Sequence, residues 1–180
     1  ASALGDDAPF MFPSTDGGEL VSRWDMQQSP PDILVTNVSM LSAMLTREVE
    51  SPIFAKTREW LEREDDAYFF LVLDELHLHR GSAGTEVSHL LRLLLQRLGL
   101  DRPEHRHKVR VLASSASLPD SPADQAEKSA KYLAGMFGPF GLGISGDEFD
   151  DTRWVDAIVS GKQVPPKYSS STPPTSLAIE

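Results

Sequence analysis

The chain has 180 residues, of which 40% are hydrophobic and 24% charged, the composition of an ordinary globular domain. Its net charge of −10 argues against the broad basic surface of a free-standing nucleic-acid-binding protein, and no apolar run is long enough to span a membrane. The absence of cysteine excludes disulfides and thiolate metal sites, and it fits a cytoplasmic location.

The two ends of the chain differ in composition from its middle. Residues 1–30 are rich in Asp, Gly, Ser and Pro, which predicts a mostly irregular lead-in. Residues 161–180 contain two Pro-Pro pairs and a serine run, which predict a disordered linker. A packed domain is therefore expected over residues 31–160.

The first half of this domain begins with a short apolar run. Residues 32–37 (DILVTN) follow two prolines and predict a buried strand. Residues 38–48 then place apolar side chains at helical spacing. A second short helix is expected over residues 57–64 (TREWLERE), with Thr57 as its N-cap.

The longest apolar run, residues 68–76 (YFFLVLDEL), predicts a central strand. After it, Thr85 is the expected cap of a helix whose apolar stripe runs from Val87 to Leu98 in steps of three and four. Gly99 is expected to end this helix in a left-handed conformation.

Residues 108–117 (KVRVLASSAS) predict a third strand, and residues 121–138 predict a helix with Pro122 in its first turn. Residues 140–149 (FGLGISGDEF) are the candidate for a last, glycine-weakened strand. Continuous apolar strands that alternate with helices predict an α/β fold, a parallel sheet with helices on both faces.

Polar side chains follow three of the predicted strands. Thr36 and Asn37 end the first, Asp74 and Glu75 the second, and a group of serines the third. Ligands of open parallel sheets bind outside the carboxyl ends of the strands, so this pattern indicates a site. The alternative is that each strand becomes polar where it meets solvent.

Asp74 and Glu75 give the most specific chemistry. Neighbouring residues on a strand point to opposite sides, so one carboxylate could face Mg²⁺ while the other faces an attacking water. Phosphoryl transfer needs this combination of a hard cation and a group that orients the nucleophile. Two acids exposed at a strand end are the simpler alternative.

The sequence from Asp74 to His77, Asp-Glu-Leu-His, resembles motif II of DEAD/DEAH-box helicases of superfamily 2, a variant of Walker B. Residues 114–117 (SSAS) are similar to motif III, and residues 30–41 (PPDILVTNVSML) to motif Ib. Residues 74–86 (DELHLHRGSAGTE) and 23–26 (RWDM) resemble the branch of large Lhr-like helicases. The resemblance covers residues 20–145 and implies part of the first RecA-like ATPase domain.

The resemblance implies roles for residues around ATP and Mg²⁺. Asp74 would hold the metal largely through water, and Glu75, also near the metal, would orient and deprotonate the attacking water. His77 would link this nucleotide site to motif III, where Ser115 and Ser117 would transmit the coupling.

The resemblance also implies contact with nucleic acid, and the branch favours DNA over RNA. Thr36, with Asn37 and Arg80, would face the nucleic-acid track. The remainder of the helicase chain would be the other partner, since this sequence contains no second RecA-like domain with its arginine finger.

The sequence departs from the family in having no G-x-x-x-x-G-K-[ST] phosphate loop. This chain alone is therefore expected neither to hydrolyse ATP nor to unwind nucleic acid. An unpaired strand edge would favour a homodimer of the isolated chain, detectable by sedimentation. Two alternatives stay open: a non-catalytic adaptor with a degenerate helicase fold, and an unrelated phosphate-handling enzyme that uses Asp74.

Residues 102–108 (RPEHRHK) form the basic cluster of the sequence. They are expected to be a solvated loop before the third strand, with phosphate contact as the alternative. His77 and His79 have no cysteine or third ligand at suitable spacing, so a zinc site is not expected.

Overall fold

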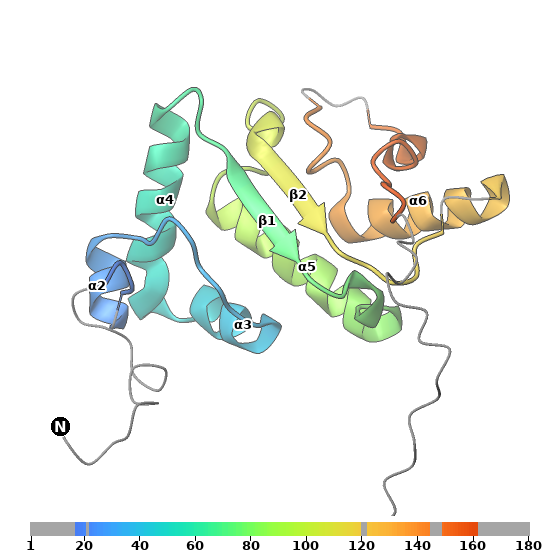
Figure 1. Ribbon diagram of the computed structural model, residues 1–180. Coiled ribbons are helices and arrows are strands. Elements are labelled where there is room, and N and C mark those ends of the chain that lie inside the picture. The colour runs from blue at the N-terminus through green and yellow to red at the C-terminus, as the bar shows by residue number, and fades with distance from the viewer. Residues whose placement is uncertain (1–16, 21, 120–121, 145–148, 162–180) are drawn as a thin grey trace, which may run out of the picture.

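Two parallel strands, β1 (Phe69–Leu73) and β2 (Val109–Ala113), form the sheet of this chain. The computed structural model describes residues 17–20, 22–119, 122–144 and 149–161. The strands pair in register from Phe69 opposite Val109 to Leu73 opposite Ala113. In Figure 1, α5 runs along the sheet, between α4 on the left and α6 on the right. A parallel sheet flanked by helices confirms the predicted α/β class, and it is compatible with an incomplete RecA-like fold.

The remaining elements are five α-helices and four 3₁₀-helices within the described residues. In chain order they are α2 (Arg23–Gln28), α3 (Val38–Thr46), η1 (Glu48–Glu50), α4 (Ser51–Arg63), η2 (Leu76–Leu78), α5 (Gly81–Arg97), η3 (Arg106–Lys108), α6 (Ala123–Phe137) and η4 (Asp151–Trp154). The short helix α2 lies inside the predicted lead-in. Residues 1–16 and 162–180, which include nearly all of the predicted linker, are outside the described residues.

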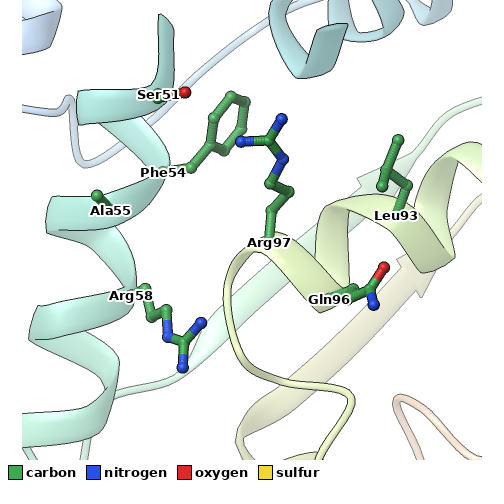
Figure 2. A pocket seen from close by; sticks show the side chains of 7 residues that line it. All are labelled: Ser51, Phe54, Ala55, Arg58, Leu93, Gln96 and Arg97. Atoms are coloured by element: carbon green, nitrogen blue, oxygen red, sulfur yellow. The ribbon is translucent and has the colours of Figure 1, made fainter. Parts of the chain in front are cut away.

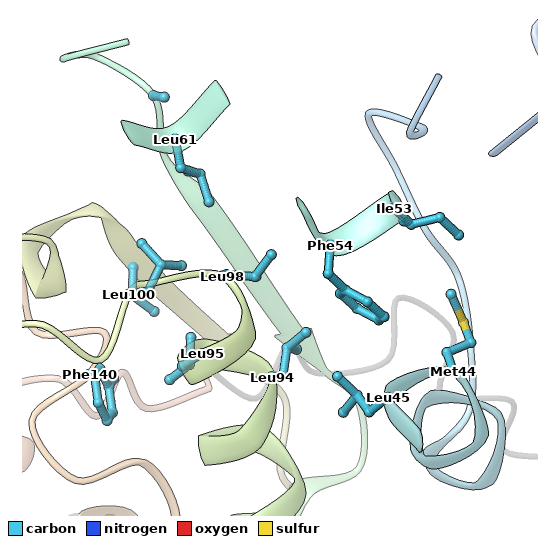
Figure 3. Packing of buried hydrophobic residues seen from close by; sticks show 12 residues of the cluster. Met44, Leu45, Ile53, Phe54, Leu61, Leu94, Leu95, Leu98, Leu100 and Phe140 are labelled. Carbon is cyan, nitrogen blue, oxygen red and sulfur yellow. The ribbon is translucent and has the colours of Figure 1, made fainter. Parts of the chain in front are cut away.

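A hollow of about 400 Å³ opens between α4 and α5, lined among others by Phe54, Arg58 and Arg97 (Figure 2). α3, α4, α5 and β2 share one apolar core, to which Phe54 also belongs (Figure 3). The predicted stripe of α5 supplies Leu94, Leu95 and Leu98 to this core. A second core joins α5 to α6 and η4, and it contains Leu76 just after β1. Both cores pack against the sheet face that carries Leu71 and Val111.

The other face of the sheet is exposed in the described part of the chain. Phe70, Val72 and Leu112 have 58%, 70% and 55% of their surface accessible. Their exposure follows from the register, because Val72 lies opposite Leu112 and parallel partners point to the same face. The cores on the first face therefore hold the fold together.

Residues 32–37 do not form the predicted strand. They pair with no strand of the described chain, and Ile33 and Val35 are 82% and 93% exposed. An apolar run is buried as a strand only when a neighbouring strand accepts its backbone hydrogen bonds, and the described chain offers none beside it. The run instead leads into α3, where the Asn37 side chain accepts a hydrogen bond from Met40 N at 2.8 Å.

Two helices begin earlier than predicted. α4 starts at Ser51, and the Thr57 hydroxyl donates to Ile53 O at 2.8 Å inside the helix. α5 starts at Gly81, and the Thr85 hydroxyl donates to Gly81 O at 3.2 Å. A threonine that bonds the carbonyl one turn earlier does not need an N-cap position, which is why both predicted caps are wrong.

The predicted end of α5 is confirmed. Gly99 has φ of 68°, its amide donates to Gln96 O at 3.0 Å, and Leu100 N donates to Leu95 O at 2.8 Å. The predicted last strand is wrong for its described residues, 140–144 and 149, because only an isolated antiparallel bridge joins Leu142 to Arg110. Residues 145–148 lie outside the described residues.

Candidate functional site

The carboxyl ends of β1 and β2 are joined beyond the last residue of each strand. Ser114 N donates to Leu73 O at 3.0 Å, and Leu76 N donates back to Ser114 O at 2.8 Å. The Leu76 side chain is fully buried in the core beneath the sheet. These bonds place the polar residues on either side of Leu76 next to residues 114–117, the serine segment that follows β2.

Asp74 and Ser114 are in direct contact. The Ser114 hydroxyl donates to Asp74 Oδ1, and Glu75 N donates to both Asp74 Oδ1 (3.1 Å) and Ser114 Oγ (3.0 Å). The Asp74 carboxylate is exposed, so one of its oxygens is held by two donors while the group still faces solvent. This arrangement fixes its direction without burying its charge.

Glu75 leaves the strand in a left-handed conformation, with φ of 51° and ψ of 47°. No other non-glycine residue of the described chain has a positive φ. Asp74 and Glu75 lie after β1, so the alternation of side chains along a strand does not apply to them. The left-handed conformation of Glu75 costs about 1–2 kcal/mol for an L-residue.

The His77 ring lies between Glu75 and the serine segment. Its Nδ1 is 3.2 Å from Glu75 Oε2 and 3.3 Å from the backbone nitrogen of Ala116. An unprotonated Nδ1 can accept from Ala116 N–H, whereas a protonated Nδ1 can donate to Glu75. The two contacts therefore exclude each other, and the proton on Nδ1 decides which one forms.

Arg80 reaches the end of the same serine segment. Its Nη2 donates to Ser117 O and Ser117 Oγ, both at 2.9 Å, and its guanidinium lies 5.9 Å from the ring centroid of Tyr132. Ser115 Oγ accepts from Ser117 N at 3.3 Å. The structure thus brings the predicted residues of motif II and motif III together through Ser114, His77 and Arg80.

Sequence reasoning missed the roles of Ser114 and Tyr132. Ser114 was recognisable as the first polar residue after β2, but the resemblance placed the functional serines at Ser115 and Ser117. Tyr132 lies on α6, where nothing in the local pattern distinguishes it from a residue that packs against the core. Its hydroxyl lies 2.8 Å from Leu76 O and 2.7 Å from His79 O.

Thr36 and Asn37 are not part of this cluster. Asn37 caps α3, and the Thr36 hydroxyl donates to Asn37 O at 3.5 Å. Within the described residues, no hydrogen bond or ion pair joins them to Asp74 or to the serine segment. Their contact with nucleic acid stays a prediction.

No group of three or more His, Cys, Asp or Glu residues in the described chain could hold a metal ion. Mg²⁺ does not need such a cage, because it keeps several waters and binds one or two carboxylates together with substrate phosphates. Asp74 and Glu75 fit that mode.

Among the described helices, none is long and apolar enough to cross a membrane.

The basic cluster of residues 102–108 is largely engaged within the fold. The Lys108 side chain is buried, and its Nζ donates to Leu61 O at 2.6 Å and to Glu64 O at 2.7 Å. Arg102 Nη1 lies 3.5 Å from Glu62 Oε1. The pKa of Glu62 is lowered, mainly by a hydrogen bond from Arg58. The expectation of a solvated loop is therefore wrong for Lys108.

Comparison with known proteins gives one similarity of note. The chain is 41% identical over 118 residues to Druantia protein DruE of Escherichia coli (strain UMEA 4076-1). The aligned part is 66% of this chain but 6% of that protein, so the chain spans a small fraction of its relative. No protein-family model matches the chain, and no solved structure matches it.

Proposed function

We propose that this chain is part of the first motor domain of an ATP-dependent superfamily 2 helicase or translocase. In this proposal, the rim formed by residues 74–77 and 114–117 faces the phosphates of ATP. The observation that carries it is the contact between Asp74 and Ser114, which joins the motif II-like and motif III-like segments at the carboxyl ends of two parallel strands. The similarity to part of DruE, a much longer protein, agrees with a chain that is one piece of a larger machine.

Each polar group on this rim has a task in ATP hydrolysis. Asp74 would bind Mg²⁺ through water, because one of its oxygens is already held by two donors. Glu75 would orient the attacking water and accept its proton, since its carboxylate is exposed on the same rim. Bound Mg²⁺ would offset the phosphate charge.

The phosphate loop and the arginine finger would come from other parts of the full-length protein. Nucleic acid, DNA in preference to RNA, would be the track along which the motor moves. The alternative, an adaptor with a degenerate helicase fold, makes no use of the Glu75 carboxylate, and this difference separates the two functions.

The test is Glu75→Gln in the full-length protein, with DNA-stimulated ATP turnover as the measurement. The substitution keeps the size of the side chain and removes the proton acceptor. We expect turnover to fall by about 10²–10⁴-fold, the usual contribution of a general base, while ATP still binds.

The matched control is Glu64→Gln, which changes a partly exposed glutamate paired with Arg63 at 2.8 Å. Its turnover should equal that of the wild type. Wild-type turnover in Glu75→Gln, or equal losses in both variants, would refute the catalytic role. Absence of any ATPase activity in the wild-type protein would favour the adaptor.

A further inference from the structure

Tyr132 is a residue of α6 that contacts the turn carrying the candidate catalytic groups. Its hydroxyl lies 2.8 Å from Leu76 O and 2.7 Å from His79 O, the carbonyls of the first residue of η2 and of the residue that follows it. Burial raises the pKa of Tyr132, and the nearby Arg80 opposes this shift. The hydroxyl is therefore protonated at neutral pH, and its single hydrogen is shared between the two carbonyls.

The same side chain supports Arg80. The guanidinium lies over the Tyr132 ring, 5.9 Å from its centroid, and donates two hydrogen bonds to Ser117. A cation above a tyrosine ring is attracted by the negative face of the ring. One residue of α6 thus contacts both the turn after β1 and the arginine that reaches the serine segment.

Two further contacts limit how this region can move. The Ser129 hydroxyl, one turn earlier on α6, donates to Pro119 O at 2.8 Å. A Cβ placed on Gly84 would lie 2.5 Å from His79 O, so the backbone of α5 passes close to the carbonyl that Tyr132 also contacts. The turn therefore has contacts with both α5 and α6, and Tyr132 supplies the polar contact from α6.

We propose that Tyr132 is a positioning residue that keeps Glu75 and His77 in register with the serine segment, so that α6 controls the geometry of the proposed ATP site. It acts through the backbone of residues 76–79 and through Arg80, and it touches neither ATP nor the metal. This inference rests on the proposed ATPase function. Its consequence is that a ligand or domain that shifts α6 would change hydrolysis without contacting the nucleotide.

The test is Tyr132→Phe in the full-length protein, which removes the hydroxyl and keeps the ring beneath Arg80. Tyr68→Phe is the matched control, because the Tyr68 ring also lies against an arginine, 4.5 Å from Arg110, but away from the turn. We expect faster hydrogen exchange of the amides of residues 75–80 and a kcat lower by about fivefold, the effect of losing one hydrogen bond, with KM for ATP unchanged. Neither quantity should change in Tyr68→Phe.

A double-mutant cycle with Ser117→Ala separates positioning from a general loss of stability. If Tyr132 acts through the turn and Arg80, the two substitutions should reduce kcat together by less than the product of their separate effects. The proposal would be overturned if the two substitutions affect kcat independently. It would also be overturned if Tyr132→Phe has the hydrogen exchange and the kcat of the wild type.

Two further cases need a decision. If Tyr132→Phe does not fold, Arg80→Lys is the second variant, because it disrupts the two hydrogen bonds from Arg80 to Ser117. Wild-type kcat in Arg80→Lys would also overturn the proposal. If the wild-type protein has no ATPase activity, the proposed function fails, and hydrogen exchange alone still decides whether Tyr132 orders the turn.

Discussion

Ser114 fixes the orientation of the exposed Asp74 carboxylate. Without its hydroxyl, Asp74 Oδ1 would keep only the amide of Glu75 as a donor, and that amide would lose its second acceptor. A hydrogen bond to a charged group contributes about 1.5–3 kcal/mol, enough to hold one orientation of an exposed side chain. The same hydroxyl accepts a hydrogen bond from the amide of Glu75 at the turn.

We therefore predict that Ser114→Ala in the full-length protein lowers ATP turnover by about tenfold or more and raises the Mg²⁺ concentration needed for half-maximal activity. Thr46→Ala is the control, because it also removes a hydroxyl, but one that donates within α3, at 3.0 Å to Ser42 O and 3.1 Å to Ala43 O. A magnesium titration of both variants measures the difference. Equal Mg²⁺ requirements would contradict the role given to Ser114.

At this scale the sequence predicted that the polar residues after β1 and β2 meet, but it wrongly added Thr36 and Asn37 to them and did not predict how they meet. The end of an apolar strand followed by Asp74 and Glu75 was readable, and so was the serine segment after the next strand. The left-handed turn at Glu75 and the hydroxyl of Tyr132 could not be read. Both depend on contacts across more than thirty residues, which a local pattern does not carry.

Among the elements, α4 is held at its C-terminal end by a buried lysine from the segment before β2. The last carbonyls of a helix have no partner within the helix, and Lys108 Nζ supplies donors to two of these groups, Leu61 O and Glu64 O. The positive charge near the C-terminus of α4 also suits the helix dipole. Lys108 thereby ties α4 to the start of β2.

We predict that Lys108→Met destabilises the chain by about 1–3 kcal/mol, because Leu61 O loses the donor from Lys108 and Glu64 O keeps only the amide of Ala67, while the apolar part of the side chain is kept. Lys131→Met is the matched control, since Lys131 is exposed and pairs with Glu127 on the surface of α6. It should change stability by less than about 0.5 kcal/mol. Urea unfolding measures both, and equal shifts would contradict the capping role.

The sequence predicted the elements better than their limits. Helical spacing identified α3 and α5, and Gly99 marked the end of α5, because these signals are local. Thr57 and Thr85 misled because a threonine hydroxyl can bond either forward as a cap or back into its own helix. Residues 32–37 misled because an apolar run does not reveal whether a neighbouring strand is present to pair with it.

Across the part of the molecule that the structure describes, only one face of the sheet is covered. The helices pack on one face of a two-stranded sheet, while Phe70, Val72 and Leu112 remain exposed on the other. The candidate site is equally open: Asp74 and Glu75 lie on a rim and do not line the hollow between α4 and α5. A rim with carboxylates and no phosphate loop fits a half-site that other parts of a longer protein complete.

The central claim is that residues 74–77 and 114–117 face one bound metal–triphosphate, and metal-directed cleavage tests it most directly. In the full-length protein, Fe²⁺ would replace Mg²⁺ with ATP, and ascorbate with peroxide would generate radicals that cut the backbone beside the metal. The proposal predicts ATP-dependent cuts within both segments, lost in Asp74→Ala. Cuts elsewhere, with both segments intact in a protein that hydrolyses ATP, would contradict it.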